Sequence, residues 1–173
     1  MTLWDLIKST KTYERSLDRE IRRVRARGGR IPKDLREKRR PTLFVNSQRV
    51  GIEEVKIARW RGTRLVLFSA ITKDSDSPTA RSTQMAFVAP KGVDIAQYAP
   101  RMTKDRCLVR SSSPWYRYCF QYANRLHKAQ YGRINPFQVK GTGKPINTRM
   151  IPGLDKHLLA LARGLQQHGL IRS

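Results

Sequence analysis

The sequence has 173 residues, 39% of them hydrophobic, which suits one domain of ordinary size with one modest core and leaves little room for a second. Its 36 Lys and Arg residues against 13 Asp and Glu give a formal net charge of +23, so the expected partner is acidic. Two cysteines, Cys107 and Cys119, are too few for a disulfide framework or a zinc ribbon. No apolar run approaches the roughly 20 residues of a membrane span, and the N-terminus lacks the apolar core of a signal peptide. We therefore expect neither a membrane span nor secretion through a signal peptide.

The basic residues gather at the two ends of the chain. Residues 1–41 hold 14 basic and 6 acidic residues, residues 42–100 hold 8 and 5, and residues 101–173 hold 14 and 2. The middle segment also has the most strand-like pattern, so we interpret it as scaffold and the flanks as contact surfaces for a polyanion or for acidic proteins. The predicted division is a basic helical arm over 1–41, an antiparallel β region over 42–110 and a helical region over 111–173, with 42–173 forming one domain.

The N-terminal flank predicts a helix with one apolar stripe. Over residues 12–29 apolar side chains recur at spacings of four, four and three, and Gly28 then ends the helix. A second short basic helix is predicted from Pro32 to Arg40. The basic faces have two interpretations: a solvated helix surface, or an arm that lies along nucleic acid or between neighbouring subunits. The stripe consists of Tyr13, Leu17, Ile21 and Val24, and the candidate contact residues are Arg22, Arg23, Arg25, Arg27, Arg30, Arg36, Lys38, Arg39 and Arg40.

The middle of the chain predicts antiparallel strands. Residues 54–60 alternate apolar and polar side chains, residues 61–63 supply a turn, and residues 64–71 return as a largely apolar strand, so this segment is a predicted hairpin. The polar residues 72–83 predict an exposed loop. Two further strands are predicted over residues 83–90 and 105–111, with an irregular crossing between them.

The C-terminal flank predicts two helices joined by a long loop over residues 133–150, which are rich in Gly, Pro and Asn. The first helix has Ser113 as N-cap and Pro114 in its first turn, and it is predicted to run to about Tyr131. Its aromatic stripe is predicted to pack into the core, and stacking on nucleic-acid bases is the alternative use. The stripe of the first helix is Trp115, Tyr118, Cys119, Tyr122 and Leu126. The last helix begins at Pro152 or Leu154 and carries the apolar residues Leu158, Leu161, Ala162 and Leu165. The candidate contact residues of this flank are Arg110, Arg117, Arg125 and Lys128.

The order of these elements indicates the fold class. We predict an α+β fold in which a small antiparallel sheet, made of the hairpin plus one or two further strands, packs with C-terminal helices and is preceded by a basic N-terminal helical arm.

Residues 111–124 and 152–157, with the segments around them, resemble a known metal-binding pattern. A strand that ends in a short turn, an aromatic-rich helix that closes on Tyr-Gly, a Pro-rich loop and a Pro-Gly helix start with Lys-His resemble the SWIM-type zinc finger, in a form found in proteins of tailed bacteriophages. The resemblance covers the chain from Arg106 to Gly169. It rests on Val109, Arg110, Pro114, Tyr118, Tyr122, Ala123, Asn124, Tyr131, Gly132, Pro152, Gly153, Lys156 and His157.

The departures from that pattern bear on the chemistry. Where the family has Cys, Cys, Cys and His, this chain has Ser111, Ser113, Asp155 and His157, so one ligand of four remains. A serine hydroxyl is too weakly acidic to replace a thiolate at neutral pH, so the resemblance implies the framework without the metal, and no cofactor is expected. We hypothesise that the two serines donate hydrogen bonds to the Asp155 carboxylate, with His157 nearby. The aromatic cluster around Trp115, Tyr118 and Tyr122 would then carry the stability that zinc no longer supplies.

Two alternatives stay open for these residues. In one, the serines only cap a helix and His157 is an ordinary core or surface histidine. In the other, a shifted zinc site draws its ligands from Cys107, Cys119, His127 and His157.

Enzyme motifs are missing from the sequence. It has no phosphate-binding glycine loop and no nucleophile elbow, and its adjacent acidic pair, Glu53 and Glu54, would point to opposite faces of a strand. We therefore predict a non-enzymatic structural component of a tailed-phage virion, in the tail, baseplate, neck or inner head, whose basic flanks contact nucleic acid without sequence specificity or bind acidic partner subunits. The alternative is a sequence-nonspecific DNA- or RNA-binding protein or a ribonucleoprotein component of ribosomal type. The expected location is the virion or the host cytoplasm, and no small-molecule substrate is expected.

Overall fold

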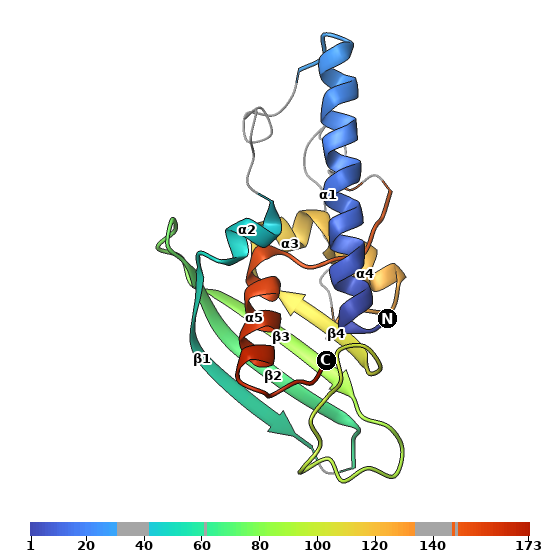
Figure 1. Ribbon diagram of the computed structural model, residues 1–173, viewed down its shortest axis with the longest axis vertical. Coiled ribbons are helices and arrows are strands. Elements are labelled where there is room, and N and C mark those ends of the chain that lie inside the picture. The colour runs from blue at the N-terminus through green and yellow to red at the C-terminus, as the bar shows by residue number, and fades with distance from the viewer. Residues whose placement is uncertain (31–41, 61, 134–146, 148) are drawn as a thin grey trace.

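The computed structural model describes residues 1–30, 42–60, 62–133, 147 and 149–173, and within them the fold is α+β. A four-stranded antiparallel sheet lies against helices from both ends of the chain (Figure 1), which confirms the predicted fold class. The elements are α1 (Leu3–Ala26), α2 (Leu43–Ser47), β1 (Val50–Arg59), β2 (Leu65–Asp74), β3 (Arg81–Val88), β4 (Arg106–Ser111), α3 (Pro114–Cys119), α4 (Gln121–Leu126) and α5 (Lys156–Gln167).

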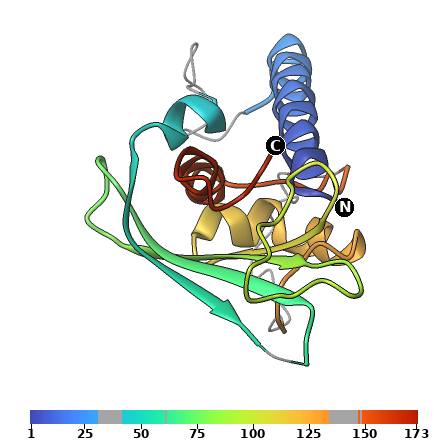
Figure 2. The same ribbon diagram turned by 60° about the horizontal axis from the view of Figure 1, so that its bottom comes forward.

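Each strand of the sheet pairs with the next in sequence, in the order β1-β2-β3-β4. The register places Phe68, Met85 and Val109 in one row across β2, β3 and β4, and all three side chains are fully buried. The helices gather over that face of the sheet (Figure 2), where α5 contributes a buried stripe. The predicted core residues of this last helix are confirmed as buried: Leu158, Leu161, Ala162 and Leu165.

The edge of the sheet at β4 is joined to other parts of the chain. The amide of Val109 donates to the carbonyl of Ala129 (2.8 Å), and the amide of Tyr131 donates to the carbonyl of Val109 (3.0 Å). The amide of Cys107 donates to the carbonyl of Met1 (2.9 Å). These bonds tie both the N-terminus and the segment after α4 to the sheet, which fixes where α1 and α4 lie.

Helix α1 begins earlier than its apolar stripe predicts, because the hydroxyl of Thr2 and the carboxylate of Asp5 form a reciprocal capping box. Its first half is held in the core, where Leu6 and Tyr13 are buried, but no residue after Leu17 is. The second half extends beyond the rest of the described structure, as Figure 1 shows. The predicted stripe is therefore buried at Tyr13 and Leu17, and only partly buried at Ile21 and Val24. The predicted end is confirmed, since Gly28 has a φ of +67° just beyond the helix.

The loop predicted over residues 72–83 is shorter than expected. Strand β2 continues to Asp74 and β3 starts at Arg81, because polar side chains find partners within the sheet. Thr72 donates its hydroxyl to the carbonyl of Arg81 (3.1 Å), and Thr83 donates to the carbonyl of Ala70 (3.2 Å). A threonine bonded in this way extends a strand where its polarity alone predicts a loop.

The helix predicted from Ser113 to Tyr131 is wrong in its extent and in its buried face. It is interrupted at Phe120 and ends at Leu126. Three residues of the predicted stripe are more than half exposed, and Trp115 is partly buried. The exposed residues are Tyr118 (54%), Tyr122 (57%) and Leu126 (54%), whereas Tyr116, Cys119, Phe120 and Ala123 form the buried face.

Two other predictions fall wholly or mostly outside the described residues. The second basic helix over residues 32–40 and most of the loop over 133–150 lie outside the described residues. The last helix begins at Lys156, with Asp155 as its N-cap, slightly later than predicted. Among the described residues no helix has the length and apolar character that a membrane crossing needs.

Candidate functional site

Ser111, Ser113, Asp155 and His157, the four positions singled out by the resemblance, lie together around a buried carboxylate. Asp155 is fully buried, and its Oδ2 accepts hydrogen bonds from the hydroxyls of Ser111 (2.9 Å) and Ser113. Its Oδ1 accepts from the backbone amide of Leu158 (2.9 Å) and so caps α5. The hypothesised contacts between the two serines and Asp155 are confirmed, and we refer to Ser111, Ser113 and Asp155 as the Asp155 cluster.

Helix capping operates in the same cluster, so the two interpretations of the serines are compatible. Ser113 is the N-cap of α3, and its hydroxyl oxygen accepts from the amide of Tyr116 (3.1 Å) while its proton goes to Asp155. The hydroxyl oxygen of Ser111, at the end of β4, accepts from the amide of Ser113 (3.2 Å). The Asp155 cluster therefore joins the end of β4 and the starts of α3 and α5.

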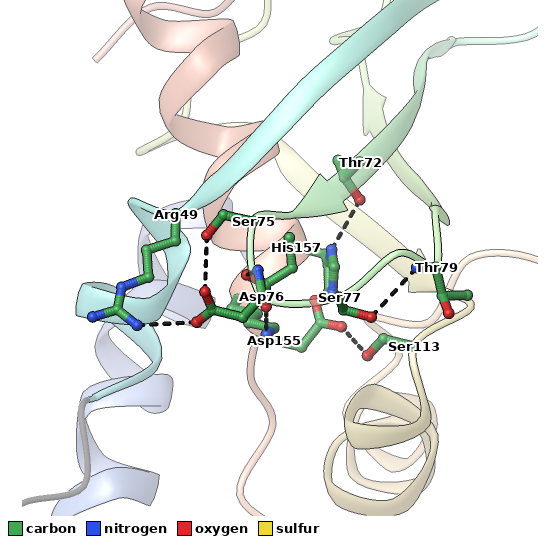
Figure 3. A network of polar contacts seen from close by, with 11 residues as sticks. Arg49, Thr72, Ser75, Asp76, Ser77, Thr79, Ser113, Asp155 and His157 are labelled. Carbon is green, nitrogen blue, oxygen red and sulfur yellow. Dashed lines mark hydrogen bonds and ion pairs between the residues drawn. The ribbon is translucent and has the colours of Figure 1, made fainter.

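His157 lies beside the cluster but bonds elsewhere (Figure 3). Its Nδ1 is 3.0 Å from the hydroxyl oxygen of Thr72, on β2. The single hydroxyl proton of Thr72 is donated to the carbonyl of Arg81, so we assign the proton of this second bond to Nδ1 of His157. Burial lowers the pKa of His157 below its usual value, while the Asp155 carboxylate acts in the opposite direction and Lys156 and Arg81 add to the decrease.

This lowered pKa predicts an acid-sensitive contribution to stability. Below the usual histidine pKa of about 6.5, the unfolded chain binds a proton at His157, whereas the folded chain does not until the pH reaches its lower pKa. The free energy of unfolding should therefore fall as the pH drops from about 6.5 towards the folded-state pKa. Urea denaturation at a series of pH values measures this slope. In His157→Gln the slope over that range should be smaller than in the unchanged protein, and an equal slope would show that His157 is not its source.

The Asp155 cluster and the neighbouring His157 are enclosed by the protein. Ser113, Asp155 and His157 are each at least 96% buried, since their exposed fractions are 3%, 0% and 4%. The serine hydroxyls are occupied by the carboxylate, and no imidazole nitrogen bonds to either of them among the described contacts. A reacting group needs access to substrate, and these side chains lack it.

The shifted zinc site is not supported in the part of the chain that the structure describes. There, no group of three or more His, Cys, Asp or Glu side chains could hold a metal ion. Cys107 and Cys119 are both buried in the apolar core, where burial raises the pKa of the Cys107 thiol. Cys119 accepts a long hydrogen bond from the hydroxyl of Tyr13 (3.7 Å), which joins α3 to α1.

The predicted basic contact residues fall into two groups on different elements. One group lies at the C-terminal end of α1 and just beyond it, where every member is exposed and where one exposed ion pair, between Arg23 and Glu20 (3.9 Å), partly offsets the charge. The other group lies on β4, along α3 and α4 and just beyond α4, and it is exposed as well. The first group is Arg22, Arg23, Arg25, Arg27 and Arg30; the second is Arg110, Arg117, Arg125 and Lys128; and Arg36, Lys38, Arg39 and Arg40 lie outside the described residues.

The predicted core position of the aromatic residues between the basic residues of α3 and α4 is wrong, because they are exposed. Tyr118 and Tyr122 lie on the outer side of this segment, next to Arg117 and Arg125. The sequence does contain a competing apolar stripe at the same helical spacing, which consists of Tyr116, Cys119, Phe120 and Ala123.

Comparison with known proteins returns no match: no family model fits the sequence, no curated protein matches it and no solved structure matches its fold.

Proposed function

We propose that this protein is a non-enzymatic structural component of a nucleic-acid-containing assembly, a tailed-phage virion, and that its basic flanks contact nucleic acid or acidic partner subunits. The observation that carries the proposal is the second half of α1. It has no buried residue after Leu17, yet it presents Arg22, Arg23 and Arg25, with Arg27 as its C-cap, from a helix whose first half is packed into the core. A positively charged helix end that extends from a firmly packed base suits contact with a large polyanion.

The length of α1 supports the same use. Its 24 residues span about 36 Å at the rise of an α-helix, and the residues after Leu17 account for roughly 14 Å of that length. The buried Tyr13 ring packs edge-on against Phe120, with ring centroids 4.8 Å apart, and so anchors the base of the projection. Arginine side chains along such a segment reach several phosphates of one duplex, or several carboxylates of one acidic surface.

The Asp155 cluster fits a protein that keeps a zinc-finger framework for its shape. Through its hydrogen bonds, the cluster joins the end of β4 to the starts of α3 and α5. In the zinc-finger pattern that the sequence resembles, zinc would join the corresponding three segments. The link to tailed phages rests on that resemblance alone.

A freely acting, sequence-nonspecific DNA- or RNA-binding protein is the second candidate. The exposed Tyr118 and Tyr122 beside Arg117 and Arg125 favour it, because aromatic and cationic side chains together are typical of surfaces that bind nucleic acid. An assembly subunit retains its partner contacts at high ionic strength, whereas a protein held by phosphate contacts alone is released.

Charge reversal in the arm tests the proposal. Replacing Arg22, Arg23, Arg25 and Arg27 with Glu should weaken binding to a labelled random-sequence duplex at every salt concentration tested. It should also reduce the slope of log affinity against log salt by about 3 to 4, since each lost phosphate contact removes about 0.9. Fluorescence anisotropy over a salt series measures both quantities.

A matched control reverses the same amount of charge elsewhere. Arg59, Arg64, Lys73 and Lys91 are exposed on the sheet and its loops, and changing these four to Glu should alter the slope much less. Equal losses in the two variants would mean that net charge alone drives binding. Unchanged binding in the arm variant would remove α1 from the contact surface.

A further inference from the structure

The outer side of α3 and α4 presents large apolar side chains to solvent. Tyr118, Tyr122 and Leu126 are each more than half exposed, and Arg117 and Arg125 flank them on the neighbouring line of the helix. We refer to these five residues as the Tyr118–Tyr122 face. Single exposed apolar residues are common on proteins, but a continuous group of them bordered by one sign of charge marks a binding surface.

The face is continuous although α3 and α4 are separate helices. The amide of Phe120 donates to the carbonyl of Tyr116 (2.9 Å), and the amide of Asn124 donates to the carbonyl of Phe120 (2.7 Å), so helical spacing persists through the interruption. Tyr118, Tyr122 and Leu126 are spaced four residues apart and therefore lie along one line. Successive members are about 6 Å apart along the helix axis.

The inner side of the same segment holds the face in place. The hydroxyl of Tyr116 donates to the carbonyl of Val109 on β4 (2.9 Å). Asn124 pairs with Gly153 in both directions, through its Nδ2 to the carbonyl (2.9 Å) and its Oδ1 from the amide (2.9 Å). Because the backbone is fixed by these buried bonds, a ligand need not order this segment when it binds.

The charges around the face are positive. Arg117 and Arg125 lie on it, and at the end of α4 the exposed Lys128 lies beside Arg106, whose guanidinium donates to the Lys128 carbonyl (3.0 Å). None of the acidic residues of the sequence falls between Asp105 and Asp155. The complementary ligand is therefore an anion that also offers flat apolar surface.

We infer that the Tyr118–Tyr122 face binds single-stranded nucleic acid, with unpaired bases stacked on the two tyrosines and phosphates bound by the flanking arginines. The inference rests on the proposed function and names the form of nucleic acid that this surface takes. In a duplex the base faces are covered by their neighbours, at about 3.4 Å along each strand, whereas the tyrosines are about 6 Å apart. An unstacked single strand can present one base to each tyrosine, and stacking of this kind tolerates any sequence.

A second copy of the chain is the main competing occupant, and charge argues against it. Pairing of two such faces would bring Arg117 and Arg125 of each copy close to the same residues of the other, with no acidic side chain on the face to neutralise them. A nucleic acid supplies the missing negative charge.

The test compares single strands with duplexes on the full chain. A labelled oligothymidine and a random-sequence duplex of equal length are titrated at fixed salt by fluorescence anisotropy. The double variant Tyr118→Ala with Tyr122→Ala should bind the single strand about 25-fold more weakly or worse, since each of the two stacked bases contributes roughly fivefold or more. It should bind the duplex almost unchanged. The double variant Tyr118→Phe with Tyr122→Phe keeps the rings and should bind like the unchanged protein. As a matched control, Trp60→Ala removes an exposed aromatic side chain elsewhere and should leave single-strand binding unchanged.

The outcomes separate this inference from the proposed function. The inference is overturned if the unchanged protein binds the duplex and the alanine variant binds the single strand as tightly as the unchanged protein does. The proposed function would then still stand. No binding of either nucleic acid overturns the inference and the nucleic-acid branch of the proposed function, and it leaves acidic partner subunits as the contact of the basic flanks. A change in sedimentation behaviour of the alanine variant, without a change in single-strand binding, would assign the face to a second copy and also overturn the inference.

Discussion

Asp155→Ala is expected to lower the free energy of unfolding by about 3 to 5 kcal/mol. The substitution removes the N-cap of α5, which by itself costs about 1 kcal/mol. It also leaves the buried hydroxyls of Ser111 and Ser113 without their acceptor, and an unsatisfied buried polar group costs about 1 to 3 kcal/mol. Urea denaturation followed by tryptophan fluorescence measures the change.

Two further variants separate the parts of this effect. Asp155→Asn keeps one oxygen to accept from the amide of Leu158 but replaces the second carboxylate oxygen, the acceptor of the two serines, with a carboxamide NH2 group. It should therefore lose about half as much stability as Asp155→Ala. Asp76→Ala removes an exposed carboxylate that pairs with Arg49 (3.0 Å; Figure 3) and should change stability by less than about 1 kcal/mol. If Asp155→Ala unfolds at the same urea concentration as the unchanged protein, the cluster does not hold the three segments together.

Local patterns allowed much of the fold to be predicted. The alternation over residues 54–60 and the Gly62 turn led to the β1–β2 hairpin, and Gly62 has the positive φ (+83°) that such a turn requires. Ser113 and Pro114 start a helix as their residue types indicate. These features are encoded within a few residues, so tertiary structure adds little to them.

The contacts of the Asp155 cluster are not encoded in local patterns of this kind. Nothing in the spacing of Ser111, Ser113 and Asp155, which lie 42 and 44 residues apart in sequence, shows that they meet. The resemblance to a zinc-binding pattern suggested it, and the hydrogen bonds bear out the proximity. His157 differs from the two serines, because its bonding partner is Thr72 on β2, and no residue of β2 is among those that carry the resemblance.

The buried face of α3 and α4 could not be predicted because aromatic residues occupy both sides of the segment. Five of the nine residues from position 114 to 122 are aromatic, so periodicity fits two faces almost equally. The choice is made by distant residues. Tyr13 of α1 packs against Phe120, and an ideal Cβ at Gly153 would lie only 2.7 Å from the Phe120 ring, so the absence of a side chain there makes room for it. Both partners belong to other parts of the chain.

Phe120→Ala is accordingly expected to destabilise the protein by about 3 to 5 kcal/mol, whereas Tyr122→Ala should cost less than about 1 kcal/mol. Phe120 is fully buried between α1 and the segment before α5, so its loss leaves a cavity at the point where α1 is anchored. Tyr122 is 57% exposed and leaves none. Thermal and urea unfolding of the two variants measures the difference.

This pair of variants also decides how stability and binding are divided along one helical segment. Tyr116, Phe120 and Ala123 face the core, and Tyr118 and Tyr122 face solvent, so truncation on the inner side should lower stability first, and truncation on the outer side should lower single-strand binding with the fold intact. A large loss of stability in Tyr122→Ala would return this residue to the core and would remove the basis of the Tyr118–Tyr122 face. A small loss in Phe120→Ala would mean that α1 is held mainly by its other buried contacts, Leu3 and Leu6 among them.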